Sequence, residues 1–135
     1  MSTVLVAADA QWVRNLVKAA CLAPGQRVVE VTRGQDVREA VREYEPDVAV
    51  LDMQIANMGG IAVSIDLRLE ASAGRLPDVS ILLLLDREAD RFLAKRGDAD
   101  AELVKPIDPS TLRQTIERLT AQSAETDEEA ETADG

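Results

Sequence analysis

The chain has 135 residues, of which 46% are hydrophobic and 30% are charged, and this balance favours one globular domain with a single core. Its net charge of −10 and the lack of a dense basic patch argue against binding to nucleic acid or to an anionic membrane, because Lys and Arg lead such contacts. Aromatic residues make up only 2% of the chain, which also argues against stacking platforms for single-stranded nucleic acid.

Histidine and cysteine usage narrows the chemistry further. The chain has no histidine, which excludes Ser-His and Cys-His nucleophile pairs and most transition-metal sites. Cys21 is the single cysteine, and its apolar neighbours predict a place on a buried helix face. No stretch has the apolar length of a membrane span, and no signal-like segment opens the chain, so the sequence predicts a cytoplasmic protein.

Strand-like apolar runs alternate with helical periods along most of the chain. In chain order, the strand-like runs are 4–8, 28–31, 48–51, 79–85 and 103–104. The helical periods that follow each of them are 13–20, 37–44, 61–69, a short one marked by 92–93, and 107–119, whose start Asp108 or Ser110 is placed to cap. Such alternation is typical of βαβ units and predicts an α/β fold with a parallel sheet.

The composition changes sharply near the end of the chain. Residues 122–135 carry six acidic side chains, no basic residue and no large apolar side chain. A segment of this kind cannot bury enough apolar surface to order itself. The sequence therefore predicts a folded domain over residues 1–121 and a disordered acidic tail over residues 122–135.

Two apolar runs end on charged residues of opposite sign. Residues 48–51 are followed by Asp52, and residues 103–104 are followed by Lys105 and then Pro106. If these runs are close in a parallel sheet, the carboxylate and the ammonium emerge at its carboxyl edge, where open α/β sheets place their chemistry. The pair predicts an acyl-phosphate or a metal site.

Three separated segments, taken in order, form a specific combination. They are Val4-Leu5-Val6 with Asp9 and Arg14 beyond it, Leu51-Asp52-Met53-Gln54 leading through Asn57-Met58 to Gly60, and Leu103-Val104-Lys105-Pro106 before the last helix. Over roughly residues 3–119 the chain resembles the receiver domain of bacterial two-component response regulators. Since no output domain follows in this sequence, the resemblance is to an atypical, stand-alone receiver.

The resemblance implies a flavodoxin-like, doubly wound (βα)5 fold with a five-stranded parallel sheet in the order 2-1-3-4-5. It implies a role in phosphorelay signal transduction, in which a histidine kinase or phosphotransfer protein transfers a phosphoryl group from its phosphohistidine to Asp52. Lys105 would then pair with the phosphoryl oxygens, and Lys105-Pro106 is expected to be cis. Fixed cations suit this chemistry, because negative charge spreads over the transferred oxygens.

The resemblance also implies a cofactor and an output surface. Mg²⁺ is the expected cofactor, held by the carboxylates of Asp9 and Asp52 and by the main-chain carbonyl of Gln54, while the side chain of Gln54 is expected to matter less. These are oxygen ligands of the kind that Mg²⁺ prefers, with waters completing its shell. An unidentified protein target is expected on the face of the fourth helix, fifth strand and fifth helix.

The chain departs from the family pattern at three positions. Ala8 stands where a second acidic residue usually ends the first strand, which predicts weaker Mg²⁺ binding and slower phosphorylation of Asp52. Leu85 aligns with the hydroxyl residue at the end of the fourth strand, and Glu102 aligns with the aromatic residue of the fifth strand. The rearrangement of hydroxyl and aromatic residue that usually reports phosphorylation is therefore expected to be missing.

Asp86 is a tentative addition to the site, because it follows the strand that lies between those of Asp52 and Lys105. It could supply the carboxylate that Ala8 lacks, or it could pair with Lys105 and hold the ammonium without any phosphate. A third alternative is a solvated helix cap for the residues from Arg87 onward.

Two functional hypotheses follow, and neither makes the chain an enzyme. In the first, the chain is a phosphoacceptor that responds to a kinase in trans. In the second, it is a pseudo-receiver that acts as a phosphorylation-independent interaction or structural subunit. An oxidoreductase is disfavoured because the first turn, Ala7-Ala8-Asp9-Ala10, lacks the glycines of a dinucleotide site.

Overall fold

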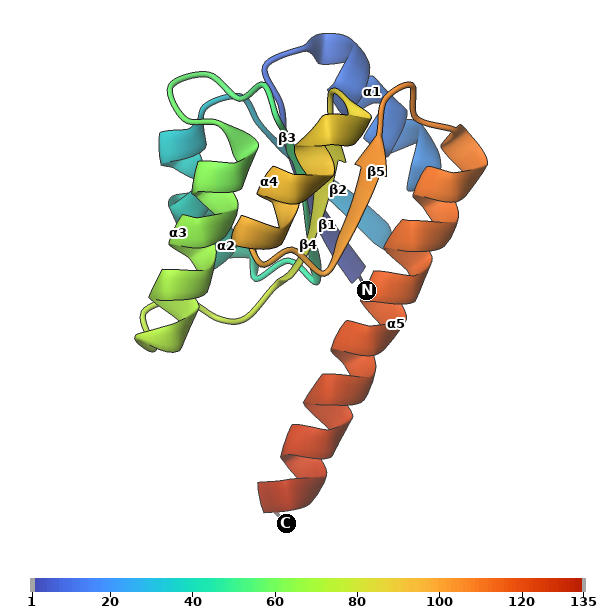
Figure 1. Ribbon diagram of the computed structural model, residues 1–135. Helices are drawn as coiled ribbons and strands as arrows, with labels where there is room; N and C mark the ends of the chain where they lie inside the picture. Colours follow the sequence, from blue (N-terminus) through green and yellow to red (C-terminus); the bar gives the residue numbers. More distant parts are fainter. Residues whose placement is uncertain (1, 135) are drawn as a thin grey trace.

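The computed structural model describes residues 2–134, with side chains through residue 124. Five parallel strands form one sheet in the order β2-β1-β3-β4-β5, as predicted (Figure 1). The strands are β1 (Ser2–Ala7), β2 (Gln26–Val31), β3 (Val48–Asp52), β4 (Ser80–Leu85) and β5 (Ala101–Val104). With helices between successive strands, the chain has the flavodoxin-like α/β fold.

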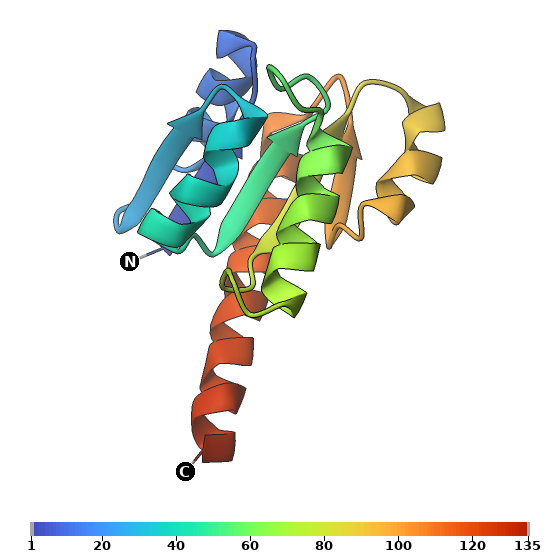
Figure 2. The ribbon, with the colours of Figure 1, turned by 90° about the vertical axis from the view of Figure 1, so that its left-hand side faces the viewer.

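Helices cover both faces of the sheet. They are α1 (Gln11–Ala20), α2 (Val37–Tyr44), α3 (Gly60–Ser72), α4 (Arg91–Arg96) and α5 (Pro109–Asp134), with short 3₁₀ turns at Gly34–Asp36 and Glu88–Asp90. Figures 1 and 2 show α2, α3 and α4 over one face and α1 and α5 over the other. Within the described residues, no helix is long and apolar enough to cross a membrane.

The sheet divides the apolar interior into two cores. Successive strand residues point to opposite faces, so the unbroken apolar runs of β1, β3 and β4 fill both sides at once. In β1, Val4 and Val6 pack with α1 and α5, whereas Leu5 and Ala7 pack with the cluster beneath α2 and α3. The continuous apolar strands therefore reflect burial on two faces.

Cys21 lies at the carboxyl end of α1 and is buried, as the sequence predicts. Burial raises the pKa of its thiol to about 11, because the thiolate would lose its hydration. Cys21 is therefore a small apolar residue of the core and not a reactive thiol.

Two helices expose some of the apolar residues that mark them in the sequence. In α3 the buried face carries Val63 and Leu67, whereas Leu69 is 63% exposed. In α4 the buried residue is Ala94, whereas Phe92 is 64% exposed. The helices were predicted correctly, but the largest apolar side chain does not always face the core when a smaller one fits the sheet better.

The last helix continues through the acidic segment. The backbone of residues 122–134 continues α5 as helix, and both views show this part of α5 extending beyond the domain (Figures 1 and 2). Alanine and glutamate are strong helix formers, so local propensity favours continuation of a helix that is already nucleated by packing at Leu112, Ile116 and Leu119. The division at residue 121 into a domain and a tail stays a prediction.

Candidate functional site

The carboxyl edge of the sheet brings Asp52 and Lys105 together. Asp52 is the last residue of β3 and is 1% exposed, and Lys105 follows β5 directly. The strand β4 lies between them, and the Lys105 amide donates to the Leu85 carbonyl at the end of β4. The Lys105 ammonium nitrogen lies 2.5 Å from Asp52 Oδ1, so the predicted pairing of these two charges is confirmed.

Asp86 completes a chain of charges at this edge. Its Oδ1 accepts a hydrogen bond of 2.7 Å from the Lys105 ammonium, and its Oδ2 accepts one of 3.0 Å from the side-chain amide of Gln54. Of the three alternatives for Asp86, the structure shows the pairing with Lys105. The amide of Arg87 is capped instead by Asp90, at 3.0 Å from its Oδ2.

The ionisation of these groups follows their surroundings. Burial raises the pKa of the Asp52 carboxyl, and the hydrogen bond from Lys105 opposes this shift. Hydrogen bonds from Gln54 and Lys105 lower the pKa of Asp86. For Lys105, burial lowers the pKa, but hydrogen bonds to Asp52 and Asp86 outweigh burial and raise it. Lys105 therefore stays a cation and Asp86 an anion at neutral pH.

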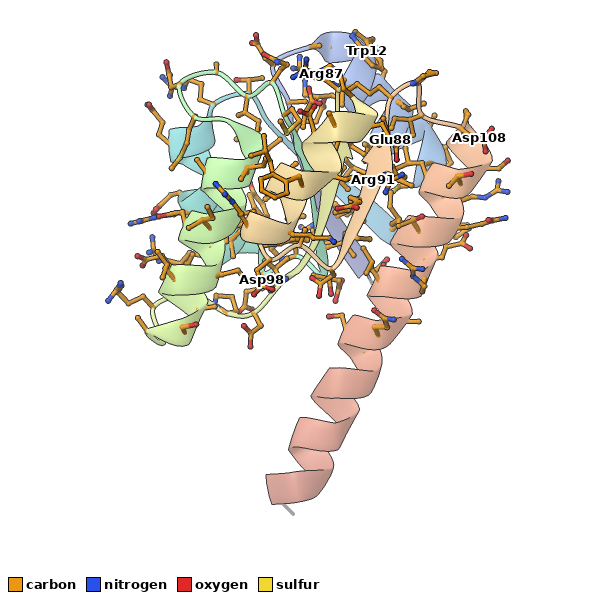
Figure 3. All side chains as sticks on the ribbon, viewed as in Figure 1. Trp12, Arg87, Glu88, Arg91, Asp98 and Asp108 are labelled. Carbon is orange, nitrogen blue, oxygen red and sulfur yellow. The ribbon has the colours of Figure 1, made fainter. Side chains whose placement is uncertain are left out.

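An aromatic ring lies against the same ammonium. Lys105 Nζ is 5.6 Å from the centre of the Trp12 ring, within the range of a cation–π contact. Figure 3 shows Trp12 on α1 at the end of the domain where Arg87, the neighbour of Asp86, also lies. Trp12 is 56% exposed, so it borders the site at the surface.

The loop after β1 contributes Asp9, whose side chain is exposed. The Asp9 amide donates to the main-chain carbonyl of Gln54 at 2.8 Å, which joins this loop to the one after β3. The Arg14 guanidinium donates to the carbonyls of Ala8 (2.8 Å) and Asp9 (2.9 Å) and so fixes the loop. The carbonyl expected to bind Mg²⁺ thus already accepts one hydrogen bond and keeps its second lone pair.

The donor set fits a hard cation in kind. Both carboxylate oxygens of Asp52 are buried. Oδ1 pairs with the Lys105 ammonium, whereas Oδ2 has no hydrogen-bond partner among the described residues, so a second cation would satisfy it. Within the described residues no three His, Cys, Asp or Glu side chains gather as a ready metal site. A Mg²⁺ ion here would therefore rely on Asp52, Asp9, the Gln54 carbonyl and several waters.

A glycine lets α3 approach the site closely. A Cβ atom on Gly60 would overlap the main-chain carbonyl of Asp52, whereas a Cβ atom on the neighbouring Gly59 would make only ordinary contacts. The amino-terminal end of α3 therefore packs directly on the backbone that carries the Asp52 carboxylate.

The positions that depart from the family pattern have other partners here. Leu85 is fully buried in the core and offers no hydroxyl to the site. Glu102 of β5 forms an ion pair of 3.1 Å with Arg91 of α4, which also pairs with Glu88 at 2.5 Å (Figure 3). An ion-pair network thus occupies the place expected for a mobile aromatic ring. The Lys105-Pro106 bond is cis, as the resemblance implies.

One site residue, Trp12, and the side-chain role of another, Gln54, were not found from the sequence. Trp12 carries no motif, because a helical residue's contact with a lysine 93 positions away depends on the fold. The side chain of Gln54 was expected to matter less than its carbonyl, yet it holds Asp86. Its position two residues after Asp52 was the available signal, since Asp52 ends β3 and Gln54 lies in the loop that follows.

Comparison with known proteins agrees with this architecture. A family model for the response regulator receiver domain matches residues 4–117. The chain is 28% identical over 121 residues to Protein PilH of Pseudomonas aeruginosa, covering 90% of this chain and 99% of PilH. It is 30% identical over 117 residues to the transcriptional regulatory protein GltR of the same species, covering 87% of this chain and 48% of GltR. The chain thus spans about half the length of that regulator.

Solved structures show the same fold. The signal receiver domain of a histidine kinase from Syntrophus aciditrophicus matches with a TM-score of 0.79 and 19% identity, covering 90% of this chain and 92% of that one. The receiver domain of the sensor histidine kinase PA1611 from Pseudomonas aeruginosa matches with a TM-score of 0.75 and 19% identity, covering 89% of this chain and 98% of that one. The latter structure has a magnesium ion coordinated in its active-site cleft.

The family match makes the chain a signalling module rather than a catalytic enzyme. The chain belongs to the response regulator receiver domain family of two-component signalling systems.

Proposed function

We propose that this chain is a phosphoacceptor receiver that takes a phosphoryl group onto Asp52 from a phosphohistidine of a histidine kinase or phosphotransfer protein. The observation that carries the proposal is the 2.5 Å pairing of the buried Asp52 carboxylate with the Lys105 ammonium at the carboxyl edge of the sheet. A nucleophile and a fixed cation at this distance are the two protein groups that phosphoryl transfer to a carboxylate needs.

The transfer step follows from the geometry. A carboxylate oxygen of Asp52 donates an electron pair to phosphorus, the P–N bond of the partner's phosphohistidine breaks, and the imidazole nitrogen keeps that pair. Asp52 Oδ2 is the better placed oxygen, since Lys105 lies against Oδ1. Lys105 offers its ammonium protons to the phosphoryl oxygens and so offsets the charge that builds up beside Asp52.

Mg²⁺ belongs to this proposal as the cofactor. Asp52 and Asp9 would hold it with their carboxylates, together with the main-chain carbonyl of Gln54. When bound, the ion neutralises negative charge between the carboxylate and the phosphoryl group. The magnesium-containing relative supports this role, and the absence of a second acid at Ala8 predicts weaker affinity than a receiver with both acids would have.

The output surface expected from the family is also part of the proposal. A groove of about 380 Å³ lies along α4, β5 and the start of α5, and its lining includes Arg91, Leu103, Ile107 and Thr111. Its mixed apolar and charged lining suits a protein segment, and Lys105 lies at its border with the phosphorylation site. We place the protein target on this surface, and the protein in the cytoplasm.

Mass measurement after incubation with acetyl phosphate and Mg²⁺ tests the proposal. One added phosphoryl group is expected, lost in Asp52→Asn and retained in Asp36→Asn, which removes the same charge from a surface pair with Arg33. If the mass of the chain with its natural sequence does not change, the proposal is contradicted.

The pseudo-receiver remains a second candidate because of specific observations. Lys105 already has a carboxylate partner in Asp86, Leu85 offers no hydroxyl, and Glu102 is held by Arg91. A chain of this kind would bind its partner equally well with and without phosphodonor. If the natural chain and Asp52→Asn bind the partner with the same affinity in the presence of phosphodonor, this candidate is favoured.

A further inference from the structure

The Lys105 ammonium serves two carboxylates at once. Its nitrogen lies 2.5 Å from Asp52 Oδ1 and 2.7 Å from Asp86 Oδ1. The Asp86 side chain is 33% exposed. Its Oδ2 accepts a hydrogen bond of 3.0 Å from the side-chain amide of Gln54. The Asp86 carboxylate is therefore held in place beside the phosphorylation site.

A phosphoryl group on Asp52 would need the space and the protons that Asp86 now uses. An ammonium has three donors, and two of them already point to carboxylates. A phosphoryl group brings three more acceptor oxygens and about two negative charges next to Asp86. Two anions that share one cation repel each other, and the repulsion is strong where water is partly excluded.

Asp86 also lacks the arrangement that would make it a helper of the reaction. It does not join Asp9 and Asp52 in a cluster of three metal-ligating side chains within the described residues. Both of its oxygens are engaged by donors of the chain itself, Lys105 and Gln54. Its contacts are those of a competing anion.

We propose that Asp86, positioned by Gln54, competes with the phosphoryl group for Lys105 and keeps phosphorylation of Asp52 low. This inference rests on the proposed function, because it concerns the same site. Asp86 acts through Lys105 and is a positioning residue. The chain thus carries an internal anion at the place where a phosphoryl oxygen would otherwise meet the ammonium.

The test compares Asp86→Asn with the unmodified chain under acetyl phosphate and Mg²⁺, with phosphorylation followed by mass. In this reaction an Asp52 oxygen attacks phosphorus, the P–O bond to the acetyl group breaks, and acetate leaves with the electron pair. The initial rate is expected to rise about tenfold in Asp86→Asn, the change that relief of about 1.4 kcal/mol of repulsion gives. Asp86→Glu keeps the charge and is expected to stay slow.

Asp36→Asn is the matched control, because it removes one carboxylate from a surface ion pair with Arg33. Its rate is expected to equal that of the unmodified chain. A melting curve for each variant establishes that it is folded.

A second readout avoids the phosphodonor altogether. Trp12 is the single tryptophan and lies 5.6 Å from the Lys105 ammonium, so its fluorescence reports on the site. In titrations with beryllofluoride and Mg²⁺, Asp86→Asn is expected to saturate at about tenfold lower concentration than the unmodified chain. A change confined to general folding would alter the melting curve without this shift.

The outcomes separate this inference from the proposed function. If only Asp86→Asn is phosphorylated, the inference stands and the proposed function of the unmodified chain fails. If both react and the variant reacts at the same rate or more slowly, the inference is overturned and the proposed function stands. If neither reacts, both are overturned, because removal of the competitor did not free the site.

Discussion

At the scale of single residues, the chemistry of the site centres on the Lys105 ammonium. Groups from three separate parts of the chain contact it: Asp52 at the end of β3, Asp86 after β4, and the Trp12 ring on α1. Asp52 is almost completely buried, so its charge depends on this one ammonium for compensation. Removal of the cation alone destabilises a fold far more than replacement of both members of a buried pair by apolar residues, because the carboxylate stays buried without a counter-ion.

Replacement of Lys105 by Met is therefore expected to destabilise the fold. The methionine side chain fills similar space but leaves Asp52 buried without a counter-ion. We expect a loss of about 2–4 kcal/mol in the free energy of unfolding, because 15% exposure of Lys105 leaves it somewhat less than fully buried. Urea denaturation at neutral pH measures it, and Lys95→Met on the exposed surface of α4 is the control with little change.

The same substitution in an Asp52→Asn background isolates the pair. In the Asp52→Asn background the residue at position 52 is already neutral, so Lys105→Met leaves no uncompensated charge. The loss in the free energy of unfolding is therefore expected to be smaller than in the natural background by about 1 kcal/mol or more. Equal losses in the two backgrounds would show that Lys105 stabilises the fold through its other contacts, with Asp86 and Trp12, and not through Asp52.

At the scale of elements, close packing of α3 on the backbone of Asp52 fixes the site. Gly60→Ala is expected to destabilise the chain by about 1–3 kcal/mol and to weaken phosphorylation of Asp52, because the added methyl group overlaps the Asp52 carbonyl. Gly59→Ala is the matched neighbour, since its backbone has φ of −68° and its Cβ meets only ordinary contacts. Similar denaturation midpoints for both variants would contradict this account.

The start of α5 supplies a pH-dependent contribution. Asp108 Oδ2 accepts hydrogen bonds from the Thr111 amide at 2.9 Å and the Thr111 hydroxyl at 3.0 Å, and these bonds lower the pKa of Asp108. Its folded pKa thus lies below the unfolded value of about 3.9, so the cap stabilises above that pH and is lost as pH falls through the folded pKa. We expect Asp108→Ala to melt at a lower temperature than the natural chain at pH 7.

Melting curves at several pH values check this dependence. The difference between Asp108→Ala and the natural chain is expected to shrink as the pH falls below about 3.9, where the natural carboxylate also becomes protonated. A difference that stays constant over this range would mean that the cap does not depend on charge. Asp78→Asn, on an exposed loop, is the control and is expected to melt at the same temperature as the natural chain at pH 7.

The elements also show which features a sequence reveals. The alternation of apolar runs and helical periods predicted the five strands and the five α-helices of the described residues, but not the two 3₁₀ turns or the length of α5. The strands were recognisable because burial on two faces imposes long apolar runs on β3 and β4. The pairing of Asp52 with Lys105 was predictable because strand ends meet at one edge. The contact of Trp12 was not, since it depends on the angle at which α1 leaves the sheet. The partner of Asp86 could not be chosen from the sequence for a similar reason. A carboxylate directly after the fourth strand is equally compatible with a metal ligand, a partner for Lys105 and a helix cap.

At the scale of the whole molecule, the domain has its two cores on either side of the sheet, and α5 extends beyond both (Figure 2). Among the side chains that the structure describes, Leu119 is the last residue of α5 in the buried core. Residues 122–135 carry six of the ten net negative charges, which leaves a net charge of −4 for the rest of the chain. Stability and solubility are therefore expected to reside in different parts of the same chain.

Removal of residues 122–135 tests this separation and the predicted domain boundary. The shortened chain keeps Leu112, Ile116 and Leu119, so its free energy of unfolding is expected to stay within about 0.5 kcal/mol of the full chain. Its solubility near pH 5 is expected to fall, because a smaller net charge weakens the repulsion between molecules. Urea denaturation and precipitation measurements on both chains check these outcomes. A loss of more than about 1 kcal/mol would place the acidic segment within the folded domain, since only packing against the domain could stabilise it by that amount.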